Sequence, residues 1–184
     1  MPRVLLFSLV LLLVSVQIAF GLGKFDVVDY ANAAVKAQEN GDLNRAFELY
    51  TEIIKSKELK KGDALLTFIY NNRGLIWADR GDLDKAIEDY TRAIENLPDE
   101  KSFINRGNAW IDKGEDDKAI EDYTRAITKK PNYARAYNYR GYARMNKGEV
   151  ELAKKDFQRA RSLDPGVDNV WRDRTNLTVT RIPE

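Results

Sequence analysis

The sequence predicts an all-α solenoid of about four helix-turn-helix repeats, and three observations support this fold class. A block of ten residues, KAIEDYTRAI, occurs at Lys85–Ile94 and again at Lys118–Ile127, an offset of 33 residues. Arginine–glycine pairs, glycines, alanines and prolines recur with nearly the same spacing. Apolar residues within each unit follow helical spacing. A period of 33 to 34 residues indicates supersecondary units that stack and bury a continuous core.

The first element is an apolar N-terminal segment, residues 1–23, which we interpret as an export signal. Arg3 is its only charged residue, and residues 4–20 are almost wholly apolar. A charged start, an apolar centre and small residues such as Gly21 and Gly23 are typical of a cleaved secretion signal. About 20 uncharged residues also suffice to span a bilayer, so an uncleaved anchor is the alternative. The sequence therefore predicts a periplasmic or secreted protein, or a membrane-anchored one.

Residues 24–66 are predicted to form a degenerate first repeat, with a longer connection to the next repeat. An aromatic residue, small residues and a second aromatic residue keep the spacing of the later repeats, at Tyr30, Ala34, Gly41, Ala46 and Tyr50. About six additional residues lie around Ser56–Ala64. We expect them to form a longer second helix or a loop. Terminal repeats are often atypical because one of their sides faces solvent.

Three complete repeats are expected next, over residues 67–99, 100–133 and 134–167. In the first of these, helices are expected over Thr67–Arg80 and Leu83–Asn96, with Gly81 as a left-handed cap between them and Pro98 as a stop. The second helix carries one apolar stripe, made of Ala86, Ile87, Tyr90, Ala93, Ile94 and Leu97. Its charged residues are expected on a solvated face, formed by Asp84, Lys85, Glu88, Asp89 and Arg92.

A glycine recurs inside the first helix of each complete repeat, where it costs about 1 kcal/mol relative to alanine. We expect close helix packing to offset this cost. The expected contacts place Gly74 against Ala86, Gly107 against Ala119 and Gly141 against Ala153.

Residues 168–184 are expected to form a capping helix and a tail. Trp171 stands at the aromatic position of a further first helix, which predicts the capping helix over Asp168–Arg174. Asn176 begins a triplet that matches the N-glycosylation pattern. About one such triplet is expected by chance in this composition, so the match alone predicts no modification.

The complete pattern resembles the tetratricopeptide repeat (TPR). An aromatic residue, two glycines, alanine, an aromatic residue, alanine and proline stand at fixed offsets, as in Tyr70, Gly74, Gly81, Ala86, Tyr90, Ala93 and Pro98. The resemblance implies a right-handed superhelix whose first helices line a concave groove that binds a peptide or a partner-protein segment. Transferred by offset, the groove residues are Asn71, Asn72, Leu75, Asp79, Lys101, Asn105, Asn108, Asp112, Arg135, Asn138, Tyr139 and Tyr142.

Asparagine suits such a groove because its amide both donates to and accepts from a peptide backbone. Alternatively, Asn72 and Asn105 are ordinary consensus residues of the repeat. A specialised version of the family holds a chaperone's terminal carboxylate with five basic and amide side chains. Only two of the five corresponding positions, Asn105 and Arg135, carry a suitable residue, so that clamp is not predicted.

The amino-acid composition excludes several kinds of catalytic and binding site. The chain has no histidine and no cysteine, which excludes imidazole catalysis, thiol nucleophiles and disulfides. After residue 23 it carries 29 basic and 29 acidic residues, which gives no indication of nucleic-acid binding. We predict no catalytic residue, metal ligand or cofactor, and a protein-binding scaffold rather than an enzyme.

Two alternatives remain open. The first is an assembly protein that self-associates through the end faces of its solenoid, with Trp171 and the first repeat as contacts. The second is a hydrolase that uses carboxylates alone, at Glu88, Asp89, Glu121 and Asp122.

Overall fold

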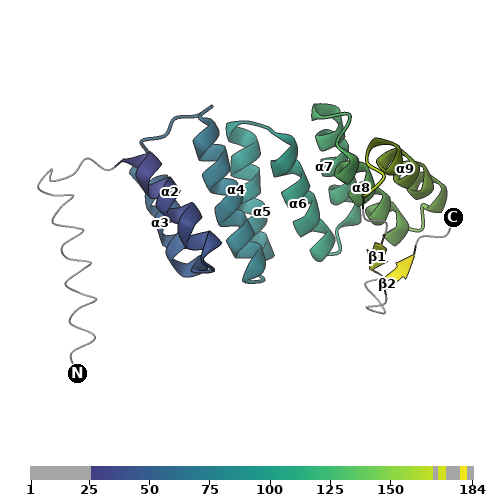
Figure 1. Ribbon diagram of the computed structural model, residues 1–184, viewed down its shortest axis with the longest axis horizontal. Helices are drawn as coiled ribbons and strands as arrows, with labels where there is room; N and C mark the ends of the chain where they lie inside the picture. The colour runs from purple at the N-terminus through teal and green to yellow at the C-terminus, as the bar shows by residue number, and fades with distance from the viewer. Residues whose placement is uncertain (1–25, 168–169, 173–178, 182–184) are drawn as a thin grey trace, which may run out of the picture. The chain divides into compact units, whose positions relative to one another are not determined.

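The computed structural model describes residues 26–167, 170–172 and 179–181. Eight helices and two short strands lie in these ranges (Figure 1). The helices are α2 (Val27–Glu39), α3 (Leu43–Ser56), α4 (Ala64–Asp79), α5 (Leu83–Asn96), α6 (Glu100–Asp112), α7 (Asp116–Lys129), α8 (Ala134–Asn146) and α9 (Val150–Leu163). They form antiparallel hairpins in chain order, and the predicted all-α solenoid is confirmed. The chain divides into two compact units between Glu58 and Leu59.

The first unit is the hairpin of α2 and α3. The Asp26 and Asp42 carboxylates accept backbone N–H groups at the two helix starts. Between the helices, Gly41 adopts a positive φ of 78°. The hairpin core is small and closely packed, with Ala34, Ala46, Leu49, Tyr50 and Ile53 almost wholly buried. The export signal predicted over residues 1–23 lies outside the described residues.

The extra residues after the first repeat form a loop rather than a longer helix. Helix α3 ends at Ser56, and Asp63 accepts the N–H of Leu65 at 2.9 Å, so α4 begins at Ala64, three residues before the predicted start. Asn96, at the end of α5, accepts the N–H of Gly62 at 2.9 Å and donates to the carbonyl of Asp63 at 2.8 Å. These bonds join the start of the second unit's first helix to the end of its second helix.

The second unit contains three hairpins, α4/α5, α6/α7 and α8/α9, and each helix packs against the next in the chain (Figure 1). Helix α5 has the predicted bounds, Leu83–Asn96. Gly81, Gly114 and Gly148 have φ between 76° and 81°, which confirms the left-handed turn between paired helices.

The mid-helix glycines do allow close packing, and the nearest atoms belong to aromatic rings rather than to the expected alanines. A Cβ atom on Gly74 would lie 2.6 Å from Cε1 of Tyr90, and one on Gly107 would lie 2.6 Å from Cε1 of Tyr123. The Phe157 ring covers Gly141 in the same way. The space that a side chain would fill is therefore occupied by an aromatic ring of the paired helix, because the ring reaches the first helix from one turn further along the second.

The prediction of a solvated face is wrong for Asp89, and the equivalent aspartates of the two later repeats are buried as well. Asp89, Asp122 and Asp156 are buried, with exposures of 3%, 2% and 4%. Each accepts two N–H bonds from an arginine 16 residues earlier on the paired helix. The pairs are Arg73–Asp89 at 2.8 and 2.7 Å, Arg106–Asp122 at 2.8 and 2.8 Å, and Arg140–Asp156 at 2.9 and 2.7 Å. A bidentate guanidinium compensates a buried carboxylate for its lost hydration.

The capping helix expected over Asp168–Arg174 is wrong where the structure describes that range. Residues Val170–Arg172 form strand β1, which pairs antiparallel with β2 (Val179–Arg181), and Val170 lies opposite Arg181. Valine, tryptophan and threonine in these segments favour extended backbone, which outweighs the helical register of Trp171. Asn176 lies outside the described residues. In the ranges that are described, no helix has the length and apolar character needed to cross a bilayer.

Candidate functional site

The candidate site is the surface formed by α4, α6 and α8, which we call the first-helix surface. The structure leaves five predicted groove residues exposed: Leu75, Asp79, Lys101, Asp112 and Arg135. Five more are partly buried: Asn72, Asn105, Asn108, Tyr139 and Tyr142. Asn71 and Asn138 are buried, with exposures of 8% and 4%. These last two lie beneath the surface and are not available to a ligand in this structure.

Asn71 joins two neighbouring repeats. Its Nδ2 donates to Oγ of Ser102 at 2.6 Å, and its Oδ1 accepts from Nδ2 of Asn105 at 3.4 Å. Ser102 is wholly buried, so this contact lies inside the packing of α4 against α6. The amide that was expected to bind a ligand instead satisfies polar groups between two helices.

Two other predicted amides make contacts within their own hairpins. Nδ2 of Asn72 donates to the carbonyl of Phe68 at 2.8 Å, one turn earlier on α4. Oδ1 of Asn108 accepts from the hydroxyl of Tyr123 at 2.8 Å. The Asn108 contact therefore fixes the ring that covers Gly107, and these residues support the surface as well as forming part of it.

The two tyrosines on α8 lie against aromatic rings of the second helices. The Tyr139 and Tyr123 ring centroids are 5.7 Å apart, and those of Tyr142 and Phe157 are 5.3 Å apart, both in tilted arrangements. Such pairs hold a ring in place while leaving part of it accessible. Phe68 and Leu75 add exposed apolar area on α4, each 42% exposed.

Exposed charges lie at opposite ends of the first helices. Lys101 and Arg135 are each the second residue of their helix, α6 and α8. Asp79 and Asp112 are each the last residue of theirs, α4 and α6. Counted by repeat offset, Lys101 corresponds to Arg135 and Asp79 corresponds to Asp112. Glu100 directly precedes Lys101, and exposed Arg80 and Lys113 directly follow Asp79 and Asp112, so both ends of the first helices carry charges of both signs.

Other cations, on or directly after the first helices α6 and α8, bind side chains on the second helix of the preceding repeat. A nitrogen of Arg106 donates to Oγ1 of Thr91 at 3.0 Å, and one of Arg140 donates to Oγ1 of Thr124 at 3.0 Å. Lys113 pairs with Asp84, and Lys147 pairs with Asp117 at 2.5 Å. The hydrogen bonds with Asp117 and Glu149 raise the pKa of the Lys147 ammonium. In the sequence, these contacts correspond to repeated spacings of 15 or 16 residues between arginine and threonine and of 29 or 30 residues between lysine and aspartate.

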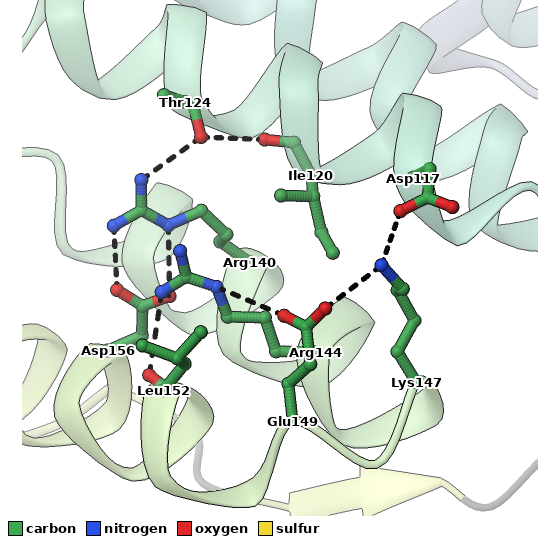
Figure 2. Close-up of polar contacts among 9 residues, drawn as sticks. All are labelled: Asp117, Ile120, Thr124, Arg140, Arg144, Lys147, Glu149, Leu152 and Asp156. Carbon is green, nitrogen blue, oxygen red and sulfur yellow. Dashed lines mark hydrogen bonds and ion pairs between the residues drawn. The ribbon is translucent and has the colours of Figure 1, made fainter.

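Figure 2 shows the fourth repeat, which differs from the two repeats before it at one pair of positions. In the two preceding repeats, the ammonium of Lys85 lies 4.4 Å from the Trp77 ring centroid, and that of Lys118 lies 4.5 Å from the Trp110 ring centroid. At the same offsets the fourth repeat has Arg144 and Leu152, so the cation and the apolar side chain exchange helices.

The exchange brings a second guanidinium to the buried aspartate. Arg144 donates to Oδ2 of Asp156 at 2.7 Å, in addition to the two bonds from Arg140, and its Nε lies 4.0 Å from Glu149 (Figure 2). Asp156 thus compensates two cations, and Glu149 lies beside both Arg144 and Lys147.

The carboxylates of the hydrolase alternative do not form a shared site. Asp89 and Asp122 are buried beneath Arg73 and Arg106, whereas Glu88 and Glu121 are exposed. Burial raises the pKa of the Asp89 carboxyl, and the adjacent Arg73 guanidinium opposes this effect. Among the described residues, no three acidic side chains gather closely enough to hold a metal ion.

Comparison with protein families gives three matches, all in the second unit. The tetratricopeptide repeat family matches residues 68–100 and 134–167. A family described as TPR repeat matches residues 107–148. Each of the three helix hairpins of the second unit is therefore covered, at least in part, by a match.

The curated relatives match over a shorter stretch. The photosystem I assembly protein Ycf3 of Prochlorococcus marinus is 35% identical over 75 residues in one strain and 33% identical over 75 residues in another. Each alignment covers 40% of this chain and 40% of the relative. The chain thus spans about two-fifths of the length of these relatives.

Solved structures are similar over more of the chain. A crystal structure of MamA has a TM-score of 0.70 and 25% identity, covering 82% of this chain and 84% of that one. The first TPR of Spaghetti (RPAP3), bound to the HSP90 peptide SRMEEVD, has a TM-score of 0.56 and 28% identity. That match covers 58% of this chain and 85% of the other.

Proposed function

Because this chain belongs to the tetratricopeptide repeat family, we propose that it is a non-enzymatic binding module whose first-helix surface holds an extended peptide or partner-protein segment. The observation that carries the proposal is the set of accessible side chains at matching offsets on three neighbouring first helices. Phe68, Leu75, Tyr139 and Tyr142 supply apolar and aromatic area. Asn72 on α4 and Asn105 on α6 supply partly accessible amides.

The contacts of this surface divide the predicted residues into two roles. Asn71 and Asn138 position the helices from below because they are buried. Asn105 and Tyr139 remain partly accessible while their rear contacts, to Asn71 and Tyr123, hold them in place. Side chains that are held before the ligand arrives lose less conformational entropy on binding.

The peptide-bound RPAP3 repeat, 28% identical to this chain, lends support to a peptide as the ligand class. A single peptide that lies across three helices has a small contact area, and small interfaces are usually weak or transient. We therefore expect micromolar affinity for a single peptide.

We further propose an extracytoplasmic location, either periplasmic or secreted, with membrane anchoring through residues 1–23 as the alternative. The support is the apolar run of residues 4–20 behind Arg3. The test is the mass of the protein recovered from its native host. Loss of about the first 23 residues would support cleavage, an intact N-terminus in the membrane fraction would support anchoring, and an intact protein in the cytoplasm would contradict both.

The binding proposal is tested by site-specific photocrosslinking in the native host. A photoreactive phenylalanine analogue replaces Tyr139, and in a matched control it replaces the exposed Glu88 on α5. We expect a discrete crosslinked partner from position 139 and none of that mass from position 88. The triple variant Asn72→Ala, Asn105→Ala and Tyr139→Ala should lose the same partner in a pull-down.

A matched triple variant, Glu88→Ala, Glu95→Ala and Glu121→Ala, removes three exposed side chains from the second helices. This variant should retain the partner. Equal recovery by wild type and both triple variants would contradict the placement of the site. A crosslinked product of twice the protein's own mass would instead identify self-association, the alternative kept from the sequence.

A further inference from the structure

We infer that the loop before α4 is a proteolytic processing site, cut after Lys60 or Lys61 by an endoprotease that cleaves after lysine. This loop, which we call the entry loop, covers residues 59–63 at the start of the second unit. A cut there leaves helices α4 to α9, and with them the whole first-helix surface, in one fragment. The inference does not depend on the proposed function.

The chain contains three pairs of adjacent lysines, and one of these pairs lies wholly outside the helices. The pairs are Lys60–Lys61, Lys129–Lys130 and Lys154–Lys155. The last pair is inside α9, and Lys129 is the final residue of α7. The N–H of Lys130 donates to the carbonyl of Ala126 at 2.9 Å, and Pro131 follows. Helical backbone must open before a protease can hold it, so the pair in the entry loop is the most accessible of the three.

The entry loop presents its lysines on a β-turn. The N–H of Asp63 donates to the carbonyl of Lys60 at 3.0 Å, and Gly62 supplies a positive φ of 92° at the third position of the turn. Lys60, Lys61 and Gly62 are exposed. Within residues 26–167, the N–H groups of Lys60 and Lys61 donate to no backbone carbonyl, and neither ammonium group forms an ion pair. Both side chains are therefore available to the specificity pocket of a protease.

Lysines at the hairpin turns are held more firmly. The N–H of Lys113 donates to the carbonyl of Ala109 at 3.1 Å, and its ammonium pairs with Asp84. At the corresponding position of the next repeat, Lys147 pairs with Asp117 at 2.5 Å. A cut at these turns requires both the helix end and the ion pair to open. The entry loop has neither restraint.

The start of α4 keeps its contacts after a cut. Asn96 donates to the carbonyl of Asp63 at 2.8 Å, and the Asp63 carboxylate accepts the N–H of Leu65 at 2.9 Å. These bonds lie on the C-terminal side of both cleavable peptide bonds. The bond after Lys60 has one hydrogen bond to open, from Asp63, and the bond after Lys61 has one, from Gly62 to Asn96 at 2.9 Å. The second unit thus keeps a capped first helix.

The reaction is hydrolysis of one peptide bond. Water supplies a hydroxyl group to the carbonyl carbon of the lysine and a proton to the nitrogen of the next residue. Transfer of the acid proton then gives a lysine carboxylate and a new α-ammonium group on Lys61 or Gly62. The cut also ends the covalent link between the first-helix surface and residues 1–23.

The first test is limited digestion of the full-length folded protein with trypsin. N-terminal sequencing of the fragments should show that the earliest cut within residues 26–167 produces a new N-terminus at Lys61 or Gly62. Cuts before residue 26 or after residue 167 are not scored. An earlier cut at any other position within residues 26–167 would overturn the inference.

Two matched double variants provide the control. K60Q/K61Q should slow the appearance of this fragment about tenfold or more, because the protease pocket requires a lysine side chain. K129Q/K130Q removes the other exposed pair and should leave the rate unchanged. Thermal denaturation shows that both variants are folded. An unchanged rate in K60Q/K61Q would contradict the assignment of the site.

The second test is made in the native host. Protein recovered from it should include the fragment that begins at Lys61 or Gly62, and K60Q/K61Q expressed there should lack it. If the wild-type protein remains uncut at the entry loop, the processing role is wrong. Crosslinking from position 139 still reports whether the surface binds a partner, so the two proposals fail independently.

Discussion

Arg106 and Asp122 lie on the two helices of one hairpin and are joined by two N–H···O bonds of 2.8 Å each. The carboxylate is 2% exposed, so it has little access to solvent. A third guanidinium N–H donates to Thr91 of the preceding repeat. One arginine therefore holds a hairpin together and joins it to its neighbour.

Replacing Asp122 by alanine should be strongly destabilising, because it leaves the Arg106 charge buried without its carboxylate. Loss of one partner of a buried pair typically costs about 3–5 kcal/mol. The adjacent Glu121→Ala change removes an exposed side chain paired with Arg125 and should cost about 0.5 kcal/mol or less. Urea denaturation of both variants measures the difference. A free energy of unfolding for D122A within about 1 kcal/mol of E121A would contradict the structural role of the pair.

Gly107→Ala should destabilise the fold although alanine is the better helix former. The new Cβ would lie 2.6 Å from Cε1 of Tyr123, a buried ring that Asn108 also holds. Overpacking of this kind costs about 1–3 kcal/mol, more than the gain of about 1 kcal/mol in helix propensity. Thermal denaturation checks the sign. Without the Tyr123 ring, in a Tyr123→Leu background, the same Gly107→Ala change should cost less stability than in the wild type. A G107A variant more stable than the wild type would contradict the ring contact.

Asn71→Ala and Asn72→Ala separate support of the surface from contact with a ligand. Asn71 is buried and bonds both Ser102 and Asn105, so its loss should cost about 1–2 kcal/mol of stability. Asn72 is partly exposed and donates to the carbonyl of Phe68 on its own helix, so N72A should change stability by about 0.5 kcal/mol or less. Denaturation curves measured in parallel test this order. The reverse order would move Asn71 back among the ligand-binding candidates.

Stability at alkaline pH should depend on Tyr50 in the first unit. Burial raises the pKa of its phenol from 10 to about 12. Below pH 10 both folded and unfolded forms are protonated, and between pH 10 and 12 the unfolded form ionises first. The stabilising contribution is therefore complete below pH 10 and is lost as pH rises toward 12. Tyr50→Phe removes this ionisation, so the difference in free energy of unfolding between wild type and variant should shift in favour of the variant over that interval. A pH-independent difference would contradict the raised pKa.

Local features of the repeats were predictable from the sequence, whereas most contacts between helices were not. Helix spacing and Pro98 fixed both ends of α5, and Gly81 marked the turn before it. These features depend on residues close together in the chain. The burial of Asp89 depends on Arg73, 16 residues earlier, and a helical wheel alone places that aspartate among solvated charges.

The candidate surface was predicted in outline only. Offsets correctly placed Lys101, Arg135 and Tyr139 on accessible parts of first helices, but they also selected Asn71 and Asn138, which are buried. For Asn71 the difference arises from the packing of α4 against α6, where its amide bonds Ser102 and Asn105. At the C-terminal end, the periodic position of Trp171 suggested a helix where the structure has strand β1.

The shared guanidinium contacts also bear on how the second unit loses its structure. In a linear array, stability is approximately the sum of terms within repeats and terms between neighbours. Arg106 and Arg140 contribute to both kinds of term, since each binds an aspartate in its own hairpin and a threonine in the preceding one. Melting one hairpin therefore removes bonding partners from the adjacent one, which penalises partly unravelled states. We therefore expect the three hairpins to unfold in a single cooperative transition rather than in three independent ones.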